Sequence, residues 1–165
     1  MRSILLAFAF LGMSFTTYAQ THFAAECQGE WTGFLHIYAG GQLRDSVEII
    51  FTSAPTDTPE VYIWRTQYLS ETHPMTKDYR LRMVNGAAGQ YETDEGDGIV
   101  LKDYRFGNKL YSMFETGETY LTATYELVGD RLIFEVTSGK QLSQDAEVNN
   151  FSVGYVQRAV LTKRE

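Results

Sequence analysis

Residues 110–136 read LYSMFETGETYLTATYELVGDRLIFEV and contain three short apolar and aromatic segments separated by Gly-Glu and Gly-Asp pairs. The last segment, Arg131–Val136, alternates polar and apolar side chains with a period of two, which is typical of a strand with one buried face. Gly117-Glu118 and Gly129-Asp130 supply residues that accept the positive φ of tight turns. The stretch therefore predicts three strands joined by hairpins.

The same spacing extends along the chain in both directions. Glycines recur at intervals of 10 to 12 residues, as expected for repeated units of one strand and one turn, at Gly86, Gly96, Gly107, Gly117, Gly129 and Gly139. Elsewhere the pattern predicts longer strands, over residues 31–38, 45–51, 61–69, 77–84 and 151–162, with a turn at Gly40-Gly41. No segment combines a helix cap with helical spacing of apolar residues, although residues 142–148 allow one helical turn.

About eight to ten consecutive strands joined by short turns predict an all-β antiparallel meander. An open meander of this size would leave two exposed edges that invite aggregation, and closure into a barrel removes both. The alternative is a β-sandwich, which needs longer crossover links than most of those present. We therefore expect a closed barrel.

The N-terminus has the pattern of a secretory signal peptide. Arg2 supplies a positive start, residues 4–13 form an uncharged apolar run, and Thr17-Tyr18-Ala19 brings small residues to a cleavage point. The apolar run is about half of the ~20 residues that a membrane-spanning helix needs. We predict a signal peptide over residues 1–19 and a single β-barrel domain over residues 20–165, exported to the periplasm or the extracellular space, with no transmembrane segment.

Length, charge and cysteine content narrow the function. The 165 residues suit one domain, and the net charge of −7, from 14 basic and 21 acidic side chains, repels phosphate backbones and argues against a nucleic-acid partner. A single cysteine, Cys27, excludes an internal disulfide, so the core itself must stabilise the domain. Cys27 lies several residues beyond the apolar run, and we interpret it as an incidental thiol rather than a lipid anchor.

The first expected strand opens with Gly29-Glu30-Trp31-Thr32-Gly33. This Gly-x-Trp resembles the signature of the lipocalins and related calycin barrels, in which the Trp packs across the closed end and a basic residue near the last strand covers it. Arg158 is the matching basic residue here, and a guanidinium can stack on an indole face. Together with Trp64-Arg65-Thr66 further along, the opening also resembles the nitrobindin-like barrels. The resemblance implies a calycin or lipocalin-like barrel with Trp31 and Arg158 in structural roles.

The nitrobindin-like barrels bind haem through a histidine near the C-terminus, and that ligand does not carry over, because the last histidine of this chain is His73. We therefore expect no haem and no other cofactor. The three histidines, His22, His36 and His73, are too scattered for a zinc site, and His22 falls in an N-terminal segment that we expect to be flexible. The acidic run over residues 92–98 lacks the spacing of a calcium loop, so no metal is predicted.

The strand over residues 61–69 mixes aromatic and polar side chains on both faces, as expected where one face borders a ligand cavity. We expect a small hydrophobic or aromatic ligand in the lumen, with an arginine fixing a polar group of it. The candidate ligand-binding residues are Tyr62, Trp64, Arg65, Tyr68, Tyr79, Arg82, Tyr111 and Tyr125. The alternative for these side chains is an aromatic ladder on the outer surface of the sheet.

Two other classes of function stay open. A barrel enzyme, such as a lyase, isomerase or hydrolase, could use Glu92, Asp94 or His36 as its acid or base. Glu92 and Asp94 lie two residues apart on an expected strand and so face the same side. The third class is a structural protein of the cell envelope. The aromatic inventory favours the ligand-binding barrel over both.

Overall fold

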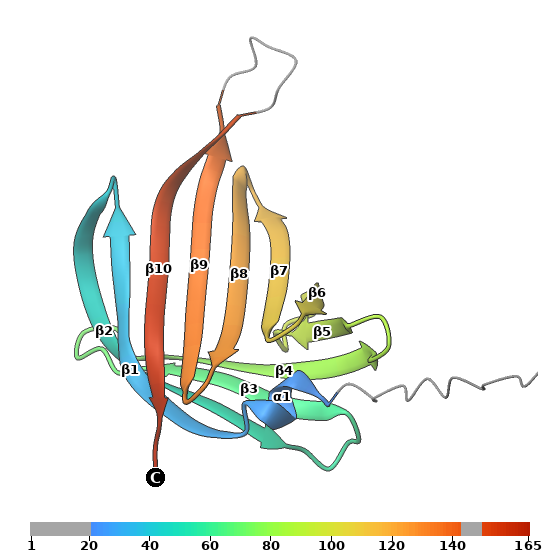
Figure 1. Ribbon diagram of the computed structural model, residues 1–165. Coiled ribbons are helices and arrows are strands. Elements are labelled where there is room, and N and C mark those ends of the chain that lie inside the picture. The colour runs from blue at the N-terminus through green and yellow to red at the C-terminus, as the bar shows by residue number, and fades with distance from the viewer. Residues whose placement is uncertain (1–20, 143–149) are drawn as a thin grey trace, which may run out of the picture.

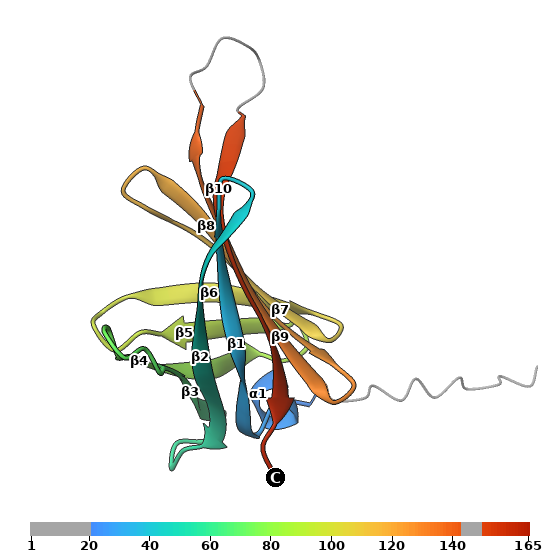
Figure 2. The same cartoon turned by 90° about the vertical axis from the view of Figure 1, so that its left-hand side faces the viewer.

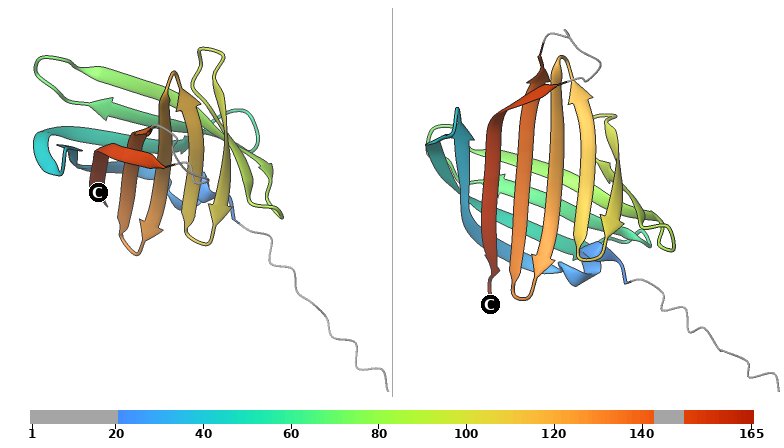
Figure 3. Two further views of the ribbon diagram at one scale, coloured as in Figure 1. Left: turned by 90° about the horizontal axis from the view of Figure 1, so that it is seen from above. Right: turned by 45° about the horizontal axis from the view of Figure 1, so that its top comes forward.

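The computed structural model describes residues 21–142 and 150–165, and the predicted signal peptide lies outside them. Within these two ranges, ten antiparallel strands form one sheet that closes on itself, in the order β1-β10-β9-β8-β7-β6-β5-β4-β3-β2 (Figure 1, Figure 3). The all-β antiparallel meander and its closure into a barrel are confirmed, and the sheets do not separate into a sandwich. The segment over residues 142–148, with its possible helical turn, falls almost wholly outside the described residues.

The strands have the following bounds: β1 (Gly29–Ala39), β2 (Gln42–Pro55), β3 (Val61–Tyr68), β4 (Met75–Asn85), β5 (Gln90–Asp94), β6 (Val100–Phe106), β7 (Lys109–Thr116), β8 (Thr119–Val128), β9 (Arg131–Gln141) and β10 (Phe151–Lys163). Each pairs with its sequence neighbour, and β1 also pairs with β10, so that Trp31 lies opposite Lys163 where the barrel closes. Figure 2 shows that β4, β5 and β6 cross β1 and β10 at a steep angle.

One of the predicted turn glycines has a different role. Gly139 lies inside β9, where a Cβ atom would fall 1.9 Å from the Ser152 carbonyl oxygen of β10. The register of β10 shifts nearby, between Val153 and Tyr155. Gly139 is therefore needed for close approach of two strands beside a bulge, and the prediction of a turn there was wrong. The turns predicted at Gly107, Gly117 and Gly129 are formed, and each of these glycines has a positive φ.

The N-terminal segment is ordered, contrary to the expectation that it is flexible. Residues Phe23–Glu26 form a short helix, α1, at the end of the barrel where the C-terminus also lies (Figure 1). Phe23 and Ala24 are fully buried. His22 caps the helix, because its Nδ1 accepts a hydrogen bond from the Ala24 amide (3.0 Å) while Nε2 lies 3.1 Å from the Glu60 carbonyl oxygen. The helix therefore acts as a plug for this end of the barrel, which we call the plugged end.

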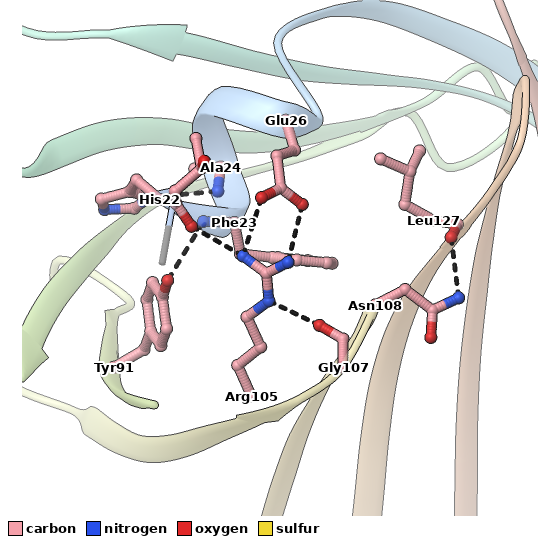
Figure 4. Close-up of polar contacts among 10 residues, drawn as sticks. His22, Phe23, Ala24, Glu26, Tyr91, Arg105, Gly107, Asn108 and Leu127 are labelled. Atoms are coloured by element: carbon pink, nitrogen blue, oxygen red, sulfur yellow. Dashed lines mark hydrogen bonds and ion pairs between the residues drawn. The ribbon is translucent and has the colours of Figure 1, made fainter. Parts of the chain in front are cut away.

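The plug is held by polar contacts as well as by packing (Figure 4). The Arg105 guanidinium donates two hydrogen bonds to the Glu26 carboxylate, at 3.0 and 2.7 Å, and a third to the Thr21 carbonyl oxygen at 2.7 Å. The Tyr91 hydroxyl accepts from the Phe23 amide at 3.1 Å. Since the paired guanidinium and carboxylate match in geometry, they fix the orientation of the helix on the barrel.

Trp31 packs at the plugged end, but Arg158 does not cover it. The cation over the Trp31 ring is Lys163, whose Nζ lies 5.6 Å from the ring centroid. Arg158 lies on the outer face of β10 and pairs with Glu135 at 3.2 Å. Arg158 and Lys163 lie five positions apart on β10, so the alternation of the strand places their side chains on opposite faces.

Candidate functional site

The interior of the barrel beyond the plugged end contains a cavity of about 160 Å³. Strands β3 to β10 all contribute side chains to its wall, and we call this part of the interior the lumen. The aromatic part of the wall consists of Trp64, Tyr68, Tyr79, Phe114, Tyr125 and Phe134. Hydroxyl groups come from Thr66, Thr93 and Ser112, while Lys77, Glu95 and Gln157 add charged and amide groups.

The aromatic wall is one contiguous cluster of rings. The centroid of the Tyr125 ring lies 4.9 Å from that of Trp64 and 4.7 Å from that of Phe134. Phe51 packs edge-on against Trp64, with 4.6 Å between the ring centroids. The Trp64 indole nitrogen is covered and has no hydrogen-bond partner among the described residues. Its ring meets both Phe51 and Tyr125 in T-shaped contacts, in which ring edges face aromatic π surfaces. The wall is therefore preformed and apolar.

A buried carboxylate lies next to this wall. Asp103 on β6 is fully buried, and it accepts a hydrogen bond from the Thr93 hydroxyl at 2.5 Å and another from the Ser112 hydroxyl. Burial raises the pKa of Asp103 to about 6, with the charge of Glu92 acting in the same direction and the two hydroxyl bonds opposing both. No ion pair joins Asp103 to a basic side chain in the part of the chain that the structure describes. A carboxylate in this environment marks a candidate functional site.

Besides Lys77 and Glu95, three tyrosine hydroxyls are titratable groups of the lumen. Burial raises the pKa of Tyr68, and burial together with the nearby charge of Glu95, which also hydrogen-bonds to it, raises that of Tyr79. Burial likewise raises the pKa of Tyr125, whose hydroxyl is hydrogen-bonded to Thr66. All three phenols are therefore neutral at physiological pH, and they can hydrogen-bond to a ligand without adding charge.

The structure brings four of the eight predicted ligand-binding residues together at the cavity: Trp64, Tyr68, Tyr79 and Tyr125. It places the other four elsewhere. Tyr62 packs against the His22 ring at 4.5 Å, beside the plug. Tyr111 is exposed on the outer face of β7, 5.9 Å from Phe106.

The two arginines that were expected to fix a ligand group also lie outside the lumen. Arg65 donates to Asp78 at 2.8 Å, and this bond together with one from Arg80 lowers the pKa of Asp78 to about 2. Arg82 pairs with Glu92. Because β3 alternates, Trp64 and Thr66 point inward while Arg65 points outward.

Several residues of the site were missed from the sequence, above all Asp103 with Thr93 and Ser112. One signal was present: Asp103 lies two residues after Leu101, so the two share a face, and both face the interior. A single carboxylate on the same strand face as an apolar residue is a sequence signal for a buried acid. Nothing in the sequence shows that Thr93 and Ser112, on two different strands, meet at this carboxylate.

The three candidate acid-base residues do not meet at one site. Glu92 lies on the outer face of β5, in its pair with Arg82. Asp94 is exposed and accepts a hydrogen bond from the Gly96 amide at 2.8 Å in the hairpin turn. His36 lies on the outer face of β1, 2.7 Å from the Ser46 hydroxyl. None of the three lines the lumen cavity.

The residues of the lumen do not fit haem. Among the described residues, no histidine, cysteine or methionine lines the cavity, and the histidines lie at the plug, on the outer face of β1 and in a loop. The cavity is close to the volume of about 150 Å³ that holds one benzene molecule, well below the size of a porphyrin. The described residues also contain no group of three metal-binding side chains.

Larger hollows lie on the outside of the barrel. One of about 360 Å³ is lined by Met113, Tyr120, Phe151 and Val153, and one of about 310 Å³ by Phe34, His36 and Arg158, among others. Both lie on outer faces, where a ligand would stay in contact with water. The lumen cavity is smaller, but it is surrounded by strands, so it offers burial from several sides.

Across residues 21–142 and 150–165, no helix has the length and apolar character needed to cross a membrane. The fold and the site define a closed antiparallel β-barrel with an internal, aromatic-lined cavity. No protein-family model matches the chain, and no curated protein is similar to it in sequence. Among solved structures, it is similar to Rv2717c from M. tuberculosis, with a TM-score of 0.52 and 14% identity over 86% of this chain and 98% of that one. At this identity the likeness shows a shared fold alone.

Proposed function

We propose that the protein is an exported, lipocalin-like binding protein whose lumen holds a small hydrophobic or aromatic molecule. The observation that carries the proposal is the unfilled lumen of about 160 Å³ between preformed aromatic walls. Small barrels commonly fill their interior with side chains. In this barrel, the buried core of the described residues leaves a cavity, whose wall includes the core residues Trp64 and Phe134. An apolar cavity with a few polar groups is the usual form of a small-molecule site.

The size of the cavity limits the ligand to about one aromatic ring with a short substituent. For so small a ligand, apolar burial gives an affinity on the order of 4–8 kcal/mol, which corresponds to millimolar to micromolar dissociation constants. The expected role is therefore capture or transport of an abundant small molecule rather than tight sequestration.

Export is a part of the proposal that rests on the pattern of residues 1–19. The lone cysteine is compatible with an oxidising compartment, because Cys27 is fully buried and burial raises the pKa of its thiol to about 12. A thiol in this state is a poor nucleophile and does not form intermolecular disulfides readily. Cys27 therefore belongs to the plugged core.

Calorimetric titration of the purified protein with toluene and phenol tests the proposal, using two variants on β8. Ala123→Phe adds a ring to the cavity wall, and we expect it to weaken binding more than tenfold. Thr122→Phe adds the same ring on the outer face one residue earlier and should leave binding unchanged. Circular dichroism checks that both variants are folded. Equal binding by the Ala123→Phe variant and the unmodified protein would exclude the lumen as the site.

A further inference from the structure

The hydroxyl groups beside Asp103 are oriented by the carboxylate. Thr93 Oγ1 donates to Asp103 Oδ2 at 2.5 Å, and Ser112 Oγ donates to Asp103 Oδ1. Thr93 and Ser112 both line the cavity, whereas Asp103 itself does not. Because a hydroxyl has a single proton, each one that donates to Asp103 offers only its lone pairs to the cavity. This side of the lumen is therefore a hydrogen-bond acceptor.

The same side of the lumen is also negative. Asp103 is fully buried without a basic partner among the described residues, whereas Glu92 on the outer face of β5 is offset by its pair with Arg82. Lys77 and Glu95, which also line the cavity, have opposite charges. An anionic ligand would have to approach a buried carboxylate through a medium that screens charge poorly, which is unfavourable.

We infer that the lumen selects a small, uncharged aromatic molecule that carries a hydrogen-bond donor, with phenols as the simplest class. Asp103 is the positioning residue, because it turns the Thr93 and Ser112 hydroxyls so that their lone pairs face the ligand. The inference rests on the proposed function, since it names the class of molecule that the lumen takes. A phenol suits the site because its hydroxyl stays protonated up to about pH 10.

A pH profile separates this role from a merely structural one. When Asp103 is ionised, both neighbouring hydroxyls donate to it. When Asp103 is protonated, it donates to one of them and frees that hydroxyl to donate to the ligand. We therefore expect the preference for donor ligands to fall as the pH drops through about 6, the pKa of Asp103. Glu92, Lys102, Tyr91 and Tyr104 border an outer hollow together with Asp103, and the titratable groups facing the cavity are Glu95, Lys77, Tyr68, Tyr79 and Tyr125.

The experiment is a calorimetric titration of the purified full chain with phenol, toluene, benzaldehyde and benzoate at a pH above the Asp103 transition. Phenol should bind about tenfold more tightly than toluene, because it adds one hydrogen bond to an acceptor that is coupled to a charge. Benzaldehyde, which carries only an acceptor, should bind no more tightly than toluene. Benzoate should bind about a hundredfold more weakly than phenol.

Matched variants test which side chains produce the preference for phenol over toluene. Thr93→Val and Ser112→Ala should each reduce the phenol-to-toluene ratio severalfold while leaving toluene binding unchanged. Thr122→Val, on the outer face of β8, is the control and should preserve the ratio. Asp103→Asn, which can donate to one of the hydroxyls, should improve benzaldehyde binding and remove the pH dependence of the ratio.

The outcomes separate the two proposals. If toluene and phenol bind with equal affinity in the lumen, or if benzoate binds most tightly, the proposed function survives and the ligand class is wrong. A phenol preference that persists in Thr93→Val and Ser112→Ala would also overturn the role of these hydroxyls and of Asp103. If none of the four molecules binds, both proposals fail.

Discussion

The two ends of the barrel interior are built on the same alternating strands but are filled in opposite ways. At the plugged end, Leu81, Leu132 and Leu161 pack without exposure around Phe23. Its buried polar atoms are paired: the Trp31 indole donates to the Cys27 carbonyl oxygen at 2.7 Å, and the Ser53 hydroxyl donates to that of Ala24, also at 2.7 Å. In the lumen, a cavity remains, and the Asp103 carboxylate is buried without a cationic partner in the part of the chain that the structure describes. The comparison indicates that the plugged end stabilises the fold, whereas the lumen lowers its stability through a cavity and a buried charge.

The two ends also respond to pH in opposite directions. At the plugged end, burial lowers the pKa of His22, which must be neutral for Nδ1 to accept the capping bond. This contribution to stability is present above the unfolded pKa of about 6.5 and is lost as the pH falls. In the lumen, the raised pKa of Asp103 means that the folded state binds the proton more tightly. Stability therefore falls as the pH rises from about 4 to about 6.

The largest expected effect is the loss of the plug. Phe23→Ala removes a fully buried ring and should lower the free energy of unfolding by about 3–5 kcal/mol. Phe34→Ala, on the outer face of β1 where the side chain is 56% exposed, is the control and should cost less than about 1 kcal/mol. Urea unfolding followed by tryptophan fluorescence measures both. Similar losses in the two variants would mean that α1 does not stabilise the barrel.

Removing Arg105, which holds the plug, should lower the free energy of unfolding less than removing the Phe23 ring does, but more than removing an arginine on the outer surface. Arg105→Met breaks a pair in which the Arg105 side chain is 8% exposed and that of Glu26 is 28% exposed. We expect a loss of about 2–3 kcal/mol, below the value for a fully buried pair, because Glu26 can rehydrate. Arg65→Met breaks an exposed pair with Asp78 and should cost at most about 1 kcal/mol. Equal losses on urea unfolding would contradict a specific role of Arg105.

At the other end of the barrel, removing the charge should stabilise the protein. Asp103→Asn keeps hydrogen bonds to Thr93 and Ser112 but avoids burying an ionised group. The shift of Asp103 to a pKa of about 6 predicts a gain of about 1–3 kcal/mol at pH 8. The decline in stability between about pH 4 and about pH 6 should also flatten. Unfolding curves measured across this range would contradict the prediction if the variant matched the unmodified protein at pH 8.

The smallest effect is expected at the helix cap. His22→Asn replaces the capping nitrogen with a side-chain oxygen that does not titrate, and it should cost about 1 kcal/mol or less at neutral pH. The loss of stability below about pH 6.5 should become shallower, because no imidazole has to stay neutral. Thermal unfolding at several pH values measures the change. If stability fell just as steeply below about pH 6.5 in the variant, groups other than His22 would cause the loss of stability in acid.

The residues of the site were predictable in part. The alternation of β3 put Trp64 and Thr66 on one face and Arg65 on the other, but the sequence alone did not show which face is the interior. Four of the tyrosines and tryptophans chosen as ligand-binding residues do line the cavity, while Tyr111 and both arginines lie on the outer surface. The choice between faces depends on how the whole sheet curves, which no single strand encodes.

The sequence by itself determined the strand pattern, because the turn glycines and the period of two are local properties of the backbone and side chains. The antiparallel meander followed from the short links between strands, and closure from the cost of exposed edges. The tertiary structure alone decided that residues 22–27 plug one end, that Lys163 rather than Arg158 lies over Trp31, and that Asp103 meets Thr93 and Ser112. These contacts join residues far apart in the chain, and they exist only when the barrel has closed and set the register of its strands.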